Sequence, residues 1–143
     1  MKAVGLYRYL PIDNPESLLD LEVETPVAAG HDLLVEVKAI SVNPVDTKRR
    51  APKDLVETTP KILGWDAAGV VKAAGPDCAL FQPGDPVYYA GSVIRPGANS
   101  EFHLVDERVA GGKPAILSFA EAAALPLTTL TAWELMFERM GIS

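Results

Sequence analysis

Ser41-Val-Asn-Pro-Val-Asp46 and Pro60-Lys-Ile-Leu-Gly-Trp-Asp-Ala-Ala-Gly-Val-Val71 are the two stretches that say most about the fold of this 143-residue chain. Just before the first stretch, Val35, Val37 and Ala39 alternate with charged residues. A period of two is typical of a strand with one face in the core and the other in water. The first stretch therefore closes a predicted strand.

The first stretch also contains a helix start. Asn43 is a good N-cap residue, Pro44 suits the first helical position, and the carboxylate of Asp46 at the third position can accept a bond from the N-cap amide. Aspartate caps helices as well as asparagine does. On this pattern alone, Asn43→Asp should leave stability nearly unchanged, whereas Asn43→Ala should cost about 0.5 to 2 kcal/mol.

Short β-branched runs separated by Gly, Pro, Asn or Asp occupy the first two thirds of the chain, which is typical of a β-barrel or sandwich. We expect strands at residues 2–7, 18–24, 33–41, 69–74, 86–90 and 101–105. The predicted fold class is mainly β with a few helices.

The character of the sequence changes after residue 113. Ser118 and Glu121 form a capping-box pattern that opens a short helix, which Pro126 interrupts. A second helix is expected from about residue 128 to 140, followed by Gly141. One stripe of this second helix is apolar: Leu130, Trp133, Phe137 and Met140. We therefore divide the chain into a β domain, residues 1–113, and a helical segment, residues 114–143.

Composition narrows the setting. A net charge of −6 argues against nucleic-acid binding, which needs clustered cations, and the run Lys48-Arg49-Arg50 is read as a solvated helix end. Cys78 is alone, so neither a disulfide framework nor a four-cysteine zinc lobe is expected. No signal peptide and no apolar run of transmembrane length is evident. These features predict a cytoplasmic protein with no membrane partner.

The two stretches, together with Phe81-Gln-Pro-Gly-Asp85, resemble the chaperonin-10-like (GroES-like) catalytic domain of medium-chain dehydrogenases/reductases. Leu125-Pro-Leu-Thr-Thr-Leu-Thr-Ala-Trp133 is similar to the helix that leads into the nucleotide-binding domain of this family. The branch that the motifs resemble most is the zinc-independent quinone oxidoreductases, including members named zinc-type alcohol dehydrogenase-like. In zinc-dependent members the two stretches supply Cys and Gly-His-Glu, whereas here Asn43, Trp65 and Asp66 stand in those places. No metal site is therefore expected.

The resemblance implies hydride transfer from NADPH to a quinone or an α,β-unsaturated carbonyl, by a parent enzyme that is a homodimer. Asn43 would donate to the acceptor oxygen or to the nicotinamide ribose, and Asp46 would fix the local backbone. Trp65 and Tyr88 would line the substrate pocket, and Thr131 would contact the cofactor. Each has a structural alternative: a helix cap for Asn43, core packing for Trp65 and Tyr88, and a bond to a preceding carbonyl for Thr131.

Other functions stay open at this point. No Gly-x-Gly-x-x-Gly dinucleotide motif occurs, so we expect the chain to be a fragment that ends at the domain junction and is inactive alone. It could instead be a stand-alone chaperonin-10-like interaction module, or part of a zinc-dependent alcohol dehydrogenase with relocated ligands. His31 and His103 have no second ligand at metal-binding spacing, which argues against the last alternative.

Overall fold

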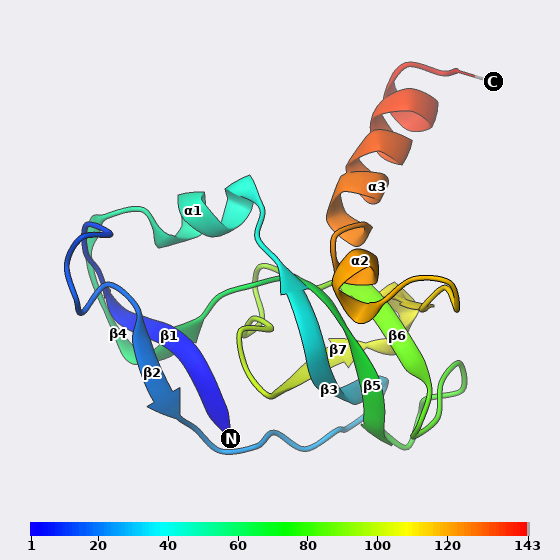
Figure 1. Cartoon of the computed structure of the whole chain (residues 1–143), viewed down its shortest axis with the longest axis horizontal. Helices are drawn as coiled ribbons and strands as arrows, with labels where there is room; N and C mark the ends of the chain where they lie inside the picture. The colour runs from blue at the N-terminus through cyan, green and yellow to red at the C-terminus, as the bar shows by residue number, and fades with distance from the viewer. Residues whose placement is uncertain (143) are drawn as a thin grey trace.

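The structure is a computed structural model that describes residues 1–142. Two antiparallel sheets form the molecule (Figure 1). The first has the order β2-β1-β4, with β1 at Lys2–Tyr9, β2 at Leu19–Glu22 and β4 at Lys53–Ile62. The second has the order β7-β3-β5-β6-β8. Its strands are β3 at Asp32–Ser41, β5 at Asp66–Ala74, β6 at Pro86–Ala90, β7 at Phe102–Asp106 and β8 at Ala110–Gly112. The predicted mainly β class is confirmed.

All six expected strands are present, but β4 and β8 were missed. The side chains of β4 are exposed along most of its length, and it contains Pro60, so its sequence does not alternate as a half-buried strand should. The strand β8 consists of Ala110, Gly111 and Gly112, which have low strand propensity. Pairing with β1 and β6, rather than local preference, places these two strands.

The main core lies on one face of the five-stranded sheet. Buried members of this core are Leu33, Val35, Ala67, Val71, Val87, Tyr89, Ala98 and Val105. The expected alternation in β3 is clearest in its first half, where Leu33 and Val35 are fully buried and Glu36 turns outward to the ammonium groups of Lys38 and Lys72. The pairing of β3 with β5 shifts register between Val37 and Ala39, and the second half of β3 is less buried than the first.

Short helices follow two of the strands, and the remaining helices follow the last strand. The helix α1, Pro44–Arg50, follows β3, and the 3-10 turn η1, Glu107–Val109, follows β7. The helix α2, Phe119–Ala123, packs Ala122 and Ala123 against Ala68 of β5. The helix α3, Pro126–Trp133, and the π-helical segment η2, Glu134–Arg139, then extend away from the sheets (Figure 1).

The second predicted helix begins two residues earlier than expected, at Pro126. Proline opens this helix at its first position, where its missing N–H needs no partner. The predicted apolar stripe is exposed: Leu130, Trp133, Phe137 and Met140 are 58%, 59%, 40% and 63% accessible. Within residues 1–142 no helix is both long and apolar enough to cross a bilayer.

Candidate functional site

The start of α1 is held by Asp46. The backbone of Asn43 is extended (φ −119°, ψ 163°), and its N–H donates to Oδ2 of Asp46 across 2.8 Å. The other oxygen of Asp46 accepts from the N–H of Gly64 at 3.1 Å. The predicted bond from Asp46 to the N-cap amide is therefore present, and the same carboxylate also holds the loop that precedes β5.

The side chain of Asn43 points to β5. Its Nδ2 donates to Oδ2 of Asp66 at 2.8 Å. Because an ionised carboxylate only accepts hydrogen bonds, the amide nitrogen must face it. The other oxygen of Asp66 accepts from the backbone N–H of Leu127, the second residue of α3, at 2.9 Å. The starts of α1, β5 and α3 thus meet at one carboxylate.

Burial is the largest influence on the pKa of Asp66, whose side chain has no exposed surface. Burial raises the pKa of this carboxyl above its ordinary value, and the nearby Asp46 raises it further. The hydrogen bonds from Asn43 and Leu127 act in the opposite direction, because they stabilise the ionised form. A buried aspartate ordinarily bonds to backbone donors, as Asp66 does with Leu127. The bond of Asp66 to Asn43 was missed, since no local signal links residues 23 positions apart.

Trp65 lies in the core. It is 2% exposed and packs with Leu6, Tyr9 and Leu63. Its indole nitrogen is buried without an acceptor among the described residues. The sequence left two roles open for Trp65, a pocket wall or core packing, and in the structure it packs in the core.

Tyr88 and Tyr89 point to opposite faces of β6, as successive strand residues do. Tyr88 is half-buried and packs against the place where α2 meets β5, near Ala68 and Phe119. Tyr89 is buried in the main core, and its hydroxyl lies 2.9 Å from Nδ1 of His103.

Thr131 is bonded within its own helix. Its hydroxyl donates to the carbonyl of Leu127, four residues earlier, at 2.8 Å. This bond is the structural alternative expected for a threonine within a helix. Thr131 and Asn43 are linked only indirectly, through α3, Leu127 and Asp66.

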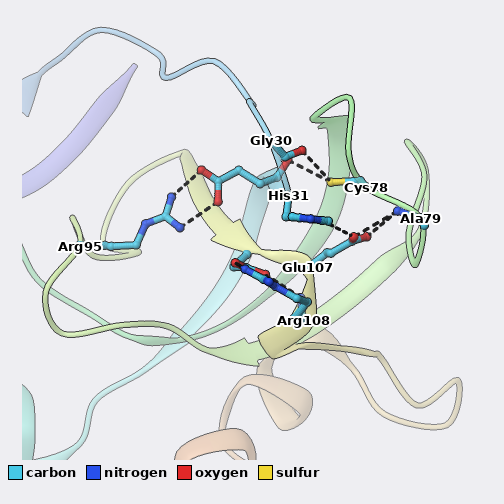
Figure 2. A network of polar contacts seen from close by, with 9 residues as sticks. Gly30, His31, Cys78, Ala79, Arg95, Glu107 and Arg108 are labelled. Carbon is cyan, nitrogen blue, oxygen red and sulfur yellow. Dashed lines mark hydrogen bonds and ion pairs between the residues drawn. The ribbon is translucent and has the colours of Figure 1, made fainter.

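The two histidines lie apart from Asn43. His103 is bonded on both ring nitrogens, to the hydroxyl of Tyr89 at 2.9 Å and to the carbonyl of Pro96 at 3.0 Å. Burial lowers the pKa of His103 to about 4. His31 contacts Glu107 at 3.1 Å (Figure 2). Across residues 1–142 there is no group of three or more His, Cys, Asp and Glu side chains placed to hold a metal ion.

A second polar network joins loops at the opposite end of β3 (Figure 2). The buried carboxylate of Glu107 accepts from the backbone N–H groups of Ala79, at 3.0 and 3.1 Å, and of Leu80, at 2.8 Å. The guanidinium of Arg95 forms a bidentate ion pair with the carboxylate of Asp32, with N–O distances of 2.7 and 2.8 Å. These contacts fix the loops after β5 and β6.

The fold agrees with the comparison to known families. Residues 29–133 match the alcohol dehydrogenase GroES-like domain. The chain belongs to this family, the N-terminal domain of medium-chain dehydrogenase/reductase oxidoreductases.

Individual relatives are similar along the whole chain. A zinc-type alcohol dehydrogenase-like protein from Staphylococcus epidermidis is 42% identical over 143 residues, which are 100% of this chain and 42% of that protein. A Rhizobium etli protein described as a zinc-dependent alcohol dehydrogenase is 60% identical, with a TM-score of 0.94 over 99% of this chain and 41% of its own. The Escherichia coli quinone oxidoreductase complexed with NADPH is 31% identical, with a TM-score of 0.82 over 98% of this chain and 41% of its own. The chain therefore spans about two fifths of the curated relatives it matches.

Proposed function

We propose that this chain is the acceptor-binding domain of an NADPH-dependent oxidoreductase that transfers hydride to a quinone or an α,β-unsaturated carbonyl without catalytic zinc. The observation that carries the proposal is the pair of contacts made by Asn43 and Trp65. The amide of Asn43 is bonded to Asp66, and Trp65 is enclosed in the core. In the zinc-dependent members of the family, these positions would hold metal ligands.

The residues at these positions do not fit a zinc ion. Catalytic zinc prefers the sulfur of cysteine and the nitrogen of histidine, together with carboxylate oxygens. The nitrogen of the Asn43 amide has no available lone pair, and neither has the indole of Trp65. Asp66 alone could ligate, but both of its oxygens already accept hydrogen bonds. The Rhizobium etli relative is described as zinc-dependent, so zinc content is a direct test of the proposal.

The chemistry of reduction then falls to hydrogen-bond donors. Bound NADPH supplies the hydride, and the protein supplies position and electrostatics. As the acceptor takes up hydride, negative charge develops on its oxygen, and one fixed donor stabilises such charge by about 3 to 4 kcal/mol. One amide proton of Asn43 is directed to Asp66. The second proton is the donor that we assign to the acceptor oxygen.

The cofactor would be held mainly by other parts of the parent enzyme. The sequence has no Gly-x-Gly-x-x-Gly turn to bind a pyrophosphate. Thr131, on the exposed part of α3, is the residue we assign to cofactor contact, and Tyr88 is assigned to the wall of the acceptor pocket, whereas Trp65 packs in the core. A relative complexed with NADPH supports the choice of cofactor. We further propose that the parent is a cytoplasmic homodimer.

An interaction module without catalysis is the alternative that the structure favours less. The rings of Trp133 and Phe137 are both well exposed, and their centroids lie 4.4 Å apart. In a stand-alone module this pair of rings would remain in water. Exposed apolar patches of this kind mark surfaces that bind a partner or a ligand, and in the proposed parent enzyme the nucleotide-binding domain would cover this one.

The proposal is tested by assaying the full-length enzyme with NADPH against a panel of quinones and enones, with a primary alcohol and NAD⁺ as the contrasting pair. Consumption of NADPH with a quinone or an enone, unaffected by chelator, supports it. Alcohol oxidation that requires added zinc contradicts it. As a companion measurement, NADPH at a hundred times its dissociation constant should stabilise the full-length enzyme by about 2.7 kcal/mol and leave residues 1–143 unshifted.

A further inference from the structure

Asp66 has an unusual combination of burial and bonding. It has no exposed surface, and within residues 1–142 the ion pairs all involve other residues, so no cation neutralises it. An unpaired buried carboxylate is costly unless hydrogen bonds satisfy it. Here two donors do so, one on each oxygen.

The two donors come from elements that are distant in the sequence. Asn43 is 23 positions before Asp66, and Leu127 is 61 positions after it. The N–H of Leu127 belongs to the first turn of α3, where backbone donors have no partner within the helix. Asp66 therefore fixes the start of α3 as well as the amide of Asn43.

A carboxylate is needed for both bonds to form. With asparagine at position 66, the side chain has one acceptor oxygen and one amide group, so either Asn43 or Leu127 would face a donor instead of an acceptor. The two aspartates near Asn43 have separate tasks, because Asp46 holds the backbone of Asn43 and Asp66 holds its side chain.

We propose that Asp66 is a positioning residue of the reductase site: it directs the amide of Asn43 to the hydride acceptor and fixes the start of α3 relative to that amide. This inference rests on the proposed function, because it assigns Asn43 to the acceptor. Asp66 itself touches neither acceptor nor cofactor. It acts by keeping the nitrogen of the Asn43 amide, rather than its oxygen, in a constant orientation, and by tying that orientation to the helix that carries Thr131.

The first arm of the test is structural and independent of activity. In NMR spectra of this chain, the side-chain amide of Asn43 and the backbone amide of Leu127 should be protected from hydrogen exchange. Asp66→Asn should remove the protection of at least one of them. The swapped double variant, Asn43→Asp with Asp66→Asn, should restore both bonds, because the amide introduced at position 66 can donate to the carboxylate introduced at position 43 and accept from Leu127. Unprotected amides in the parent chain would overturn the inference.

The second arm uses the full-length enzyme and separates positioning from stability. Asp66→Asn should lower kcat for the quinone or enone by about tenfold or more. Glu107→Gln is the matched control, because it also removes bonds to a buried carboxylate but lies at the opposite end of β3. The control should lower the melting temperature while kcat stays within about twofold. The swapped variant should regain thermal stability without regaining kcat.

The outcomes distinguish the two proposals. If Asp66→Asn keeps parental kcat while its melting temperature falls as in Glu107→Gln, Asp66 is only a structural residue and the inference is overturned. If the parent enzyme reduces no acceptor in the panel, the proposed function fails, and the positioning role fails with it even where the NMR arm finds both hydrogen bonds.

Discussion

Nδ2 of Asn43 lies 2.8 Å from Oδ2 of Asp66, so the side chain of the residue that caps α1 is bonded to β5. A helix cap and a link between elements are thus combined in one residue. The backbone of Asn43 serves α1 through Asp46, while its amide satisfies a buried carboxylate. Substitutions at this position therefore act on two interactions with different chemistry.

The first prediction concerns stability and revises what the capping pattern alone predicts. Asn43→Asp keeps a good N-cap but places a second carboxylate against Asp66, so we expect it to be less stable than the parent by about 3 kcal/mol or more at about pH 8. Asn43→Ala should cost about 1 to 3 kcal/mol, because Asp66 loses one donor.

The pH dependence of the stability of Asn43→Asp shows whether repulsion between the two carboxylates causes the loss. Two carboxylates that share a site hold a proton, so the pKa of one of them is raised in the folded state. The folded Asn43→Asp protein then binds a proton that the unfolded chain releases, and its free energy of unfolding falls as pH rises. Urea unfolding at about pH 5 and about pH 8 measures this. Equal stability of Asn43→Asp and the parent at the higher pH would show that the two side chains do not face each other.

The second prediction concerns catalysis in the full-length enzyme. Both variants lose the amide donor, so kcat/KM with a quinone and an enone should fall by about 100-fold. Asn43→Asp should lose at least as much as Asn43→Ala, because it adds negative charge where negative charge develops. Thr47→Ala is the control on α1, since it removes only the exposed bond to the carbonyl of Pro44. Parental kcat/KM in Asn43→Asp would reduce Asn43 to a helix cap.

The third prediction is the zinc content of the purified protein. Because the amide of Asn43 is a poor zinc ligand and the indole of Trp65 has no lone pair to give, no stoichiometric zinc should remain after dialysis against a chelator. Added zinc should also leave the melting temperature unchanged, because an ion that binds the folded state would stabilise it. About one zinc per chain, retained through dialysis, would place the protein in the zinc-dependent branch.

The sequence predicted best what is local. Ser118 and Glu121 form their reciprocal cap within three residues, with bonds of 2.8 and 3.2 Å. The limits of β6 follow from the Gly-Asp turn before it and Gly91 after it. The contact of Asn43 with Asp66 and that of Asp66 with Leu127 depend on how β3, β5 and α3 come together. Residue types and spacing carry no record of that arrangement, and the same limit applies to β4.

The fourth prediction addresses the network of Figure 2. Hydrogen bonds, led by the one from Leu80, hold the pKa of Glu107 below its ordinary value. Such a carboxylate stabilises the folded state above its unfolded pKa, and this stabilisation is lost as pH falls through the lowered folded pKa. Glu107→Gln should therefore lower the melting temperature at about pH 7 and differ less from the parent in acid. A difference that grows toward low pH would contradict this account.

The last prediction concerns the buried pair of His103 and Tyr89. Burial lowers the pKa of His103 from 6.5 to about 4 and raises that of Tyr89, so a neutral imidazole donates from Nε2 to Pro96 and accepts at Nδ1 from the tyrosine hydroxyl. As pH falls from 6.5 toward 4, the unfolded chain binds a proton that the folded chain does not, and the free energy of unfolding must fall. His103→Gln should flatten this dependence of the free energy of unfolding on pH.

Tyr89→Phe leaves Nδ1 of His103 without a donor and should cost about 1 to 3 kcal/mol, whereas Tyr88→Phe, at the half-buried neighbour, should be nearly neutral. Urea unfolding across this pH range measures both effects, and an NMR titration in which the His103 ring takes up its proton near 6.5 would contradict the prediction.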